Sequence, residues 1–186
     1  MADLIVVALE KEAPELFQHY SNVHVIGIGK VNAAIHLAKL IYRYHPRRVI
    51  NIGTAGGITV NAGIHRINRV IQHDVNMMPL GLDPGAVLND PDNTVVELPG
   101  PGVTCASGDM FVTEPEKLRV PCDIIDMEAY PIARVCKALG IQCEIWKYIS
   151  DSADGKSASK WQAEVKSGQD YYKQVLKDLN VVLEPK

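Results

Sequence analysis

The sequence predicts an α/β protein, a three-layer α/β/α sandwich around a mainly parallel central sheet. Short apolar runs rich in β-branched residues alternate along the chain with longer amphipathic stretches, as strands alternate with crossover helices. Polar or glycine-rich junctions follow most of the apolar runs. Because no repeat or linker-like composition interrupts the sequence, we expect residues 1–186 to form a single domain with a sizeable core.

The expected strands are the short apolar runs, each of which ends at a turn residue or a polar residue. They cover residues 3–9, 23–29, 48–54, 66–75, 103–109, 123–127 and 141–149. The first run is too short, and the residues around it are too acidic, for a signal peptide. We therefore interpret it as the first strand.

Apolar residues at helical spacing predict the helices between these strands. The helices cover residues 11–20, 30–45, 128–140 and 157–179. Gly140 is expected at the C-terminal end of the third helix, and Pro131 is tolerated in its first turn. Residues 77–101 are rich in Pro, Gly, Asp and Asn and predict a long loop, a feature that is commonly functional inside a compact domain.

The composition excludes several classes of function. The chain is 47% hydrophobic and 22% charged with a net charge of −3, which gives no basic face for nucleic acid. No apolar segment is long enough to span a membrane. The four cysteines lack the spacing of a zinc site, so we expect reduced thiols in a cytoplasmic protein and no metal. They are Cys105, Cys122, Cys136 and Cys143.

Polar junctions at the ends of the strands predict where a ligand would bind. In sheets of this kind, ligands bind beyond the carboxyl ends of the strands. The junctions that follow strands are residues 10–12, 27–30, 53–57, 107–109, 126–128 and 150–154. Their convergence at one edge of the sheet is a stronger signal than any single junction.

Each junction also has a plainer structural interpretation. "GIGKVNAA" has Asn32 at the third glycine position of a dinucleotide fingerprint and lacks the acidic partner, so dinucleotide binding is disfavoured. "NIGTAGG" allows a ligand to approach the backbone, or is a simple turn. Phe111 could stack on a base or fill the core. Glu128 could accept ribose hydroxyls or favour a helix start, and Asp151 could be a general acid or part of a solvated turn.

Six motifs, taken in their order along the chain, resemble those of the nucleoside phosphorylase/nucleosidase superfamily, and most closely those of its methylthioadenosine/S-adenosylhomocysteine nucleosidase branch. They are "ALEKEA", "GIGKVNAA", "NIGTAGGI", "SGDMFV", "DMEAYPIARVC" and "ISDSAD". The resemblance extends from Leu4 to the final helix and implies a trimmed nucleoside phosphorylase-like fold. It also implies a shortened region at residues 77–101, which in the family helps to form the pocket for the 5′ substituent.

The resemblance implies a role for each matching residue. Glu12 matches the glutamate that activates the attacking water, and Asp151 the aspartate that protonates N7 of the purine. Glu128, with Met127, matches the pair that holds the ribose hydroxyls, and Phe111 the ring that stacks on the base.

Other matching positions complete the implied site. The backbone of Val112 matches the group that reads the base. Thr54 lies near the water and sugar in the glycine turn, together with Ala55 and Gly56. Ser150 could orient the carboxyl group of Asp151. Lys147 stands where many bacterial members carry an arginine near the water.

The activity implied by the resemblance is hydrolysis of the N-ribosidic bond of an adenine-type, 5′-modified nucleoside, without metal or organic cofactor and in a homodimer. The alternatives are a purine nucleoside phosphorylase and a non-catalytic nucleoside-binding protein of the same fold. Phosphorylases use arginines around the glycine turns to bind phosphate, but this chain has Asn51 ahead of "IGTAGG" and Glu12 after the first strand. Water is therefore favoured as the nucleophile.

Overall fold

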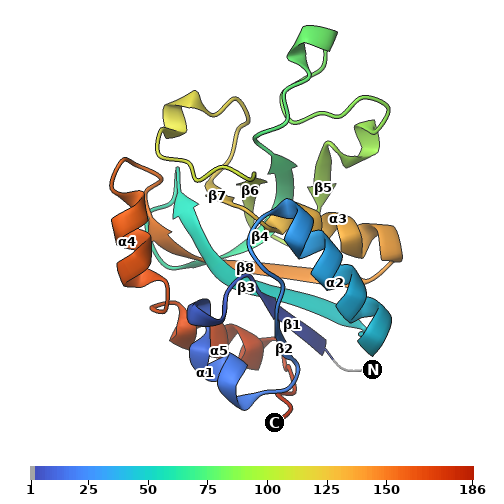
Figure 1. Cartoon of the computed structure of the whole chain (residues 1–186), viewed down its shortest axis with the longest axis vertical. Coiled ribbons are helices and arrows are strands. Elements are labelled where there is room, and N and C mark those ends of the chain that lie inside the picture. The colour runs from blue at the N-terminus through green and yellow to red at the C-terminus, as the bar shows by residue number, and fades with distance from the viewer. Residues whose placement is uncertain (1–2) are drawn as a thin grey trace.

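The computed structural model describes residues 3–186, and its strands form one mixed sheet with helices packed around it (Figure 1). The strands are β1 (Asp3–Val7), β2 (Val23–Val25), β3 (Arg48–Gly57), β4 (Ile64–Gln72), β5 (Val95–Glu97), β6 (Val103–Ser107), β7 (Ile124–Asp126) and β8 (Gln142–Asp151). The α/β class predicted from the sequence is confirmed.

The described part of the chain also contains five α-helices and four short 3₁₀ turns, of which α4 and α5 follow the last strand. The α-helices are α1 (Pro14–His19), α2 (Lys30–Tyr44), α3 (Ala129–Leu139), α4 (Ser157–Glu164) and α5 (Gln169–Asp178). The 3₁₀ turns are η1 (Glu10–Glu12), η2 (Met78–Leu80), η3 (Pro91–Asn93) and η4 (Pro115–Lys117). Gly140 ends α3 in the left-handed conformation, as expected from the sequence.

The sheet is mixed and closes on itself, which corrects the expectation of a three-layer sandwich around a mainly parallel sheet. β3 pairs in parallel with β1 and β8, and β8 pairs in antiparallel with β4. β4 then pairs in parallel with β6, β6 with β7, and β7 returns in antiparallel to β3. The closing pair needs Gly57 at the end of β3, because a Cβ atom there would collide with the carbonyl oxygen of Val60.

Helices cover two faces of the sheet and define two main clusters of buried side chains. α2 and α3 pack on one face, and α1 and α5 on the other (Figure 1). β1 contributes to both clusters because its side chains alternate between the two faces of the sheet. Leu4 and Val6 belong to the first cluster, and Ile5 and Val7 to the second. The fully buried Tyr172 anchors α5 in the second cluster.

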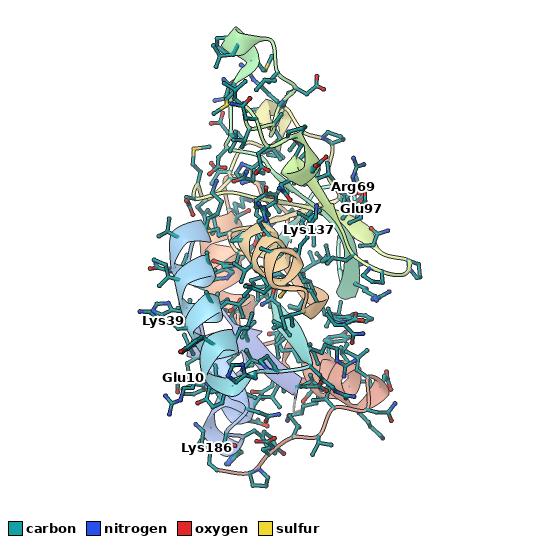
Figure 2. All side chains as sticks on the ribbon, turned by 90° about the vertical axis from the view of Figure 1, so that its right-hand side faces the viewer. Glu10, Lys39, Arg69, Glu97, Lys137 and Lys186 are labelled. Atoms are coloured by element: carbon teal, nitrogen blue, oxygen red, sulfur yellow. The ribbon has the colours of Figure 1, made fainter. Side chains whose placement is uncertain are left out.

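Two segments differ from the sequence-based expectation. The region 77–101 rises above the sheet (green in Figure 1) but ends in β5, which pairs in antiparallel with β4. Arg69 and Glu97 form an ion pair across these two strands (Figure 2). The single helix expected at 157–179 is divided into α4 and α5, and Gly168 lies at the junction against the hydroxyl of Tyr172.

Two expectations from composition can be compared with the structure. Cys105, Cys136 and Cys143 are buried, Cys122 is half-buried, and all four thiols are free. Within residues 3–186, no helix has the length and apolar character needed to cross a membrane.

Candidate active site

A cavity of about 240 Å³ opens at the carboxyl ends of the strands, where the sequence predicted a ligand site. The last residues of β3, β7 and β8 and the segments after β1, β2, β6 and β7 all contribute to its lining. Of the predicted site residues, those that line it are Glu12, Thr54, Ala55, Gly56, Phe111, Val112, Met127, Glu128, Ser150 and Asp151. Lys147 does not line it.

Glu12 is fixed by three hydrogen bonds although it lies on the short turn η1. Its Oε1 accepts from the backbone N–H and the hydroxyl of Thr54, both at 2.8 Å, and its Oε2 accepts from Leu9 N–H at 3.0 Å. The side chain is 4% exposed. A carboxylate offers about four acceptor sites, so one remains on Oε2 for a further donor such as water.

Asp151 reaches the cavity because β8 is irregular at its end. Ala55 pairs with Ile149 and Gly56 with Asp151, so Ser150 is an extra residue in β8, a β-bulge. Adjacent residues of a regular strand point to opposite faces, but here Ser150 and Asp151 both line the cavity. Asp151 Oδ2 accepts from Ser150 Oγ at 2.9 Å and Oδ1 from the Ala153 N–H at 2.9 Å.

Glu128 is the buried acid at the start of α3. Its Oε1 accepts from the Gly29 N–H at 2.9 Å, which connects it to the junction after β2. Burial and the neighbouring Asp126 raise the pKa of Glu128 to about 8, while Lys147 opposes this shift. Near pH 7 this carboxyl group is therefore mainly protonated and can both donate and accept hydrogen bonds.

Lys147 is buried beside the carboxyl groups of the site and does not line the cavity. It was predicted to bind substrate near the water, but it is 1% exposed, and its Nζ forms an ion pair with Asp126 Oδ2 at 2.8 Å. Burial alone would lower the pKa of Lys147, but the carboxylates of Asp126, Glu128 and Glu12 raise it above its usual value. A primary amine on a long stem is thus buried next to the acids Asp126 and Glu12 without lining the cavity itself.

Asp126 is the partner that the sequence analysis did not assign to the site. Its Oδ1 accepts from Ser107 Oγ at 2.5 Å and its Oδ2 from the Ala129 N–H at 2.8 Å, in addition to the bond with Lys147. Burial would raise the pKa of Asp126, but Lys147 and these hydrogen bonds hold it below its usual range. Its position at the end of a strand was the signal that could have identified it.

Apolar side chains form the rim of the cavity. Phe111 is 48% exposed and Met110 61% exposed, and both lie in the segment after β6 that lines the cavity. A core role for Phe111, the plainer alternative, is therefore wrong. An exposed aromatic ring at the mouth of a cavity can stack on a flat ligand.

Trp161 on α4 is a second lining residue that the sequence analysis did not identify. Its indole Nε1 donates to Thr54 Oγ1 at 3.1 Å, so it contacts the group that also holds Glu12. The helical pattern placed this tryptophan on a helix, but nothing in the sequence indicated that the helix would fold over the end of β3.

One ion pair and two hydrogen bonds join the segment after β2 to the segment after β6. Lys30 Nζ pairs with Asp74 Oδ1 at 2.6 Å, and Asp74 Oδ2 accepts from the Asp109 N–H at 2.8 Å. Asp109 Oδ1 in turn accepts from the Lys30 N–H at 2.7 Å. Asp74 thus connects the segment after β2 to the segment after β6.

Comparison with known proteins is consistent with this geometry. A 5′-methylthioadenosine/S-adenosylhomocysteine nucleosidase of Buchnera aphidicola is 33% identical over 169 residues, which cover 76% of this chain and 67% of the relative. A nucleosidase of the same name from a Geobacillus species is 33% identical over 156 residues, covering 70% of this chain and 67% of the relative.

Solved structures share the fold at lower identity. A Streptococcus pneumoniae MTA/SAH nucleosidase in complex with 8-aminoadenine superposes with a TM-score of 0.82 at 21% identity, covering 95% of this chain and 97% of that one. A futalosine hydrolase of Helicobacter pylori gives 0.85 at 18% identity, covering 96% and 98%. The family model described as "Phosphorylase superfamily" matches residues 6–179. The chain therefore belongs to the phosphorylase superfamily.

Proposed function

We propose that this protein is a nucleosidase that hydrolyses the N-ribosidic bond of a 5′-modified adenine nucleoside and releases the free base. The observation that carries the proposal is the placement of two fixed acids, Glu12 and Asp151, in the wall of one cavity, with Glu128 and the exposed Phe111 between the same strand ends. The names of the relatives at 33% identity support this substrate class.

The roles proposed for the acids follow from the charges that the reaction develops. Breaking the bond leaves oxocarbenium character on the sugar and an electron pair on the purine. Asp151 donates a proton to N7 of the leaving base, and Glu12 accepts a proton from the water that attacks the sugar carbon. A positioned acid and a positioned base each typically contribute about 10²–10⁴-fold to the rate.

Glu128 is proposed to hold the two ribose hydroxyls. One of its oxygens is occupied by the Gly29 N–H, so the carboxyl group is oriented before a ligand arrives. A protonated carboxyl group can donate to one hydroxyl while it accepts from the other. Its pKa of about 8 places this form in the majority near neutral pH.

The lining of the cavity favours water over phosphate. Among the residues that the structure describes, none of the side chains lining the cavity is Lys, Arg or His, whereas Glu12, Asp126, Glu128 and Asp151 all line it. An anionic phosphate would face carboxyl groups without a cationic partner in the wall. This argues against the phosphorylase alternative.

The test is a panel of adenine nucleosides that differ at the 5′ position, scored for free adenine with and without phosphate. We expect adenine and a free ribose derivative at the same rate in both conditions. Strict dependence on phosphate, with ribose 1-phosphate as product, would make the protein a phosphorylase.

We also propose that residues 1–186 act as one nucleosidase domain and that two copies form a homodimer. Exposed apolar side chains extend from the cavity rim along α2, including Ile28, Val31 and Ile35, and support burial against a second copy. The mass in solution tests this, and a monomer at micromolar concentration would contradict it.

A further inference from the structure

The indole of Trp161 connects α4 to the acid that is proposed to hold the water. Trp161 Nε1 donates to Thr54 Oγ1 at 3.1 Å, and Thr54 Oγ1 donates to Glu12 Oε1 at 2.8 Å. The bonds thus run from α4 through the end of β3 to the turn η1. All three residues line the cavity.

The direction of this chain of hydrogen bonds is fixed by chemistry. An indole N–H is only a donor, and a carboxylate is only an acceptor. Thr54 has one hydroxyl proton, so when its oxygen accepts from Trp161 that proton is directed to Glu12. Without the indole N–H, the hydroxyl would be free to rotate and to donate to a water or a ligand.

A second contact holds Trp161 against the same turn. The Nζ of Lys11 lies 4.0 Å from the centroid of the Trp161 ring, within the range of a cation–π interaction. Lys11 is the residue directly before Glu12 in η1. Trp161 therefore contacts η1 both through this lysine and through Thr54.

We propose that Trp161 is a positioning residue for the hydrolytic reaction. It directs the Thr54 proton to Glu12 Oε1, so that both acceptor sites of Oε1 are occupied and the attacking water is directed to the free site on Oε2. This inference rests on the proposed function. Because Trp161 acts on the water-holding acid and not on the base or sugar, its loss should lower kcat more than it changes KM.

The test is a double-mutant cycle between Trp161 and Thr54. Trp161→Phe keeps an aromatic ring and removes the N–H, and we expect kcat to fall about three- to tenfold with KM within about twofold. Thr54→Val removes the hydroxyl with little change of shape. In the Thr54→Val background, Trp161→Phe should change kcat by less than about 1.5-fold.

Trp146 provides the matched control. Its indole nitrogen is buried and lacks a hydrogen-bond partner among residues 3–186, and it does not line the cavity. Trp146→Phe therefore removes an N–H that bonds nothing, and we expect it to keep the wild-type kcat.

Two results would overturn the role of Trp161 while leaving the proposed function intact. One is a Trp161→Phe variant whose kcat equals that of an active wild type. The other is an equal loss of kcat in both Thr54 backgrounds. If the wild type releases no adenine, the proposed function fails instead. In that case the NMR resonance of the Trp161 indole N–H still decides: it should move in Thr54→Val while that of Trp146 stays, and an unmoved Trp161 resonance refutes the contact.

Discussion

Replacing Lys147 with methionine tests how much its buried ion pair with Asp126 contributes to the stability of the fold. Lys147 and Asp126 are each 1% exposed at their side chains, and their charged atoms are 2.8 Å apart. Methionine fills a similar volume but leaves Asp126 with a buried, unpaired charge. Removing one partner of such a pair costs about 3–5 kcal/mol. For a chain of this size, this corresponds to a fall in Tm of roughly 6–20 °C.

The assay is thermal and urea unfolding at pH 7 of the wild type, Lys147→Met and the double variant Lys147→Met/Asp126→Asn. The double variant removes the stranded charge and should be more stable than the single variant. Lys173→Met is the control, because Lys173 is 42% exposed at its side chain and its ion pair with Glu15 lies at the surface. We expect the control to leave the unfolding curve nearly unchanged.

The reasoning is refuted by either of two results. The first is a loss of less than about 1 kcal/mol in the unfolding free energy of Lys147→Met, since a fully buried charge that loses its partner should destabilise the fold by more than that. The second is a double variant that is no more stable than the single one. That result would mean that the volume of the lysine, and not the charge left on Asp126, accounts for the loss.

Three further predictions concern the acids and the aromatic rim of the cavity. Glu12→Gln and Asp151→Asn should each lower kcat for adenine release by about 10²–10⁴-fold, and rates equal to wild type would contradict their catalytic roles. The pKa of Glu128 is raised from 4.5 to about 8 on folding, so the folded state holds a proton that the unfolded state releases between these values. Stability should therefore fall by a few kcal/mol as the pH rises from 4.5 to 8, and urea midpoints of Glu128→Gln should lack this slope. Phe111→Ala should raise KM for adenine nucleosides about five- to fiftyfold, the equivalent of about 1–2 kcal/mol of lost ring contact, and an unchanged KM would show that the ring does not touch the base.

The positions of the strand-end residues could be predicted because they depend on local pattern. The apolar runs expected at 48–54 and 141–149 end at Thr54 and just before Asp151, and parallel strands bring such ends to one edge. Gly140 ends its helix for an equally local reason, the tolerance of glycine for a left-handed backbone. Asp154, in the junction expected at 150–154, accepts from the Lys156 N–H two residues later, as a local turn does.

The features that could not be predicted depend on contacts between distant parts of the chain. Closure of the sheet needs β7 to pair with the end of β3, and no pattern within either strand encodes that pairing. The same holds for the contact of Trp161 with Thr54, which are 107 residues apart. The position of Lys147 matched a family arginine, but its ion pair with Asp126 joins two strands that lie far apart in the sequence and could not be predicted from either one.

The bulge at Ser150 makes the direction of Asp151 depend on the number of residues in β8 as well as on their types. Loss of Ser150 would restore a regular ladder in which Asp151 still pairs with Gly56, but it would remove the hydroxyl that donates to Asp151 Oδ2 and change the direction in which the carboxyl group leaves the strand. The remaining residues would still align with those of the intact sequence. A single in-frame deletion could therefore change the orientation of Asp151 while sparing the rest of the architecture. Homologues with this change would be found by counting the residues between Lys147 and Asp151.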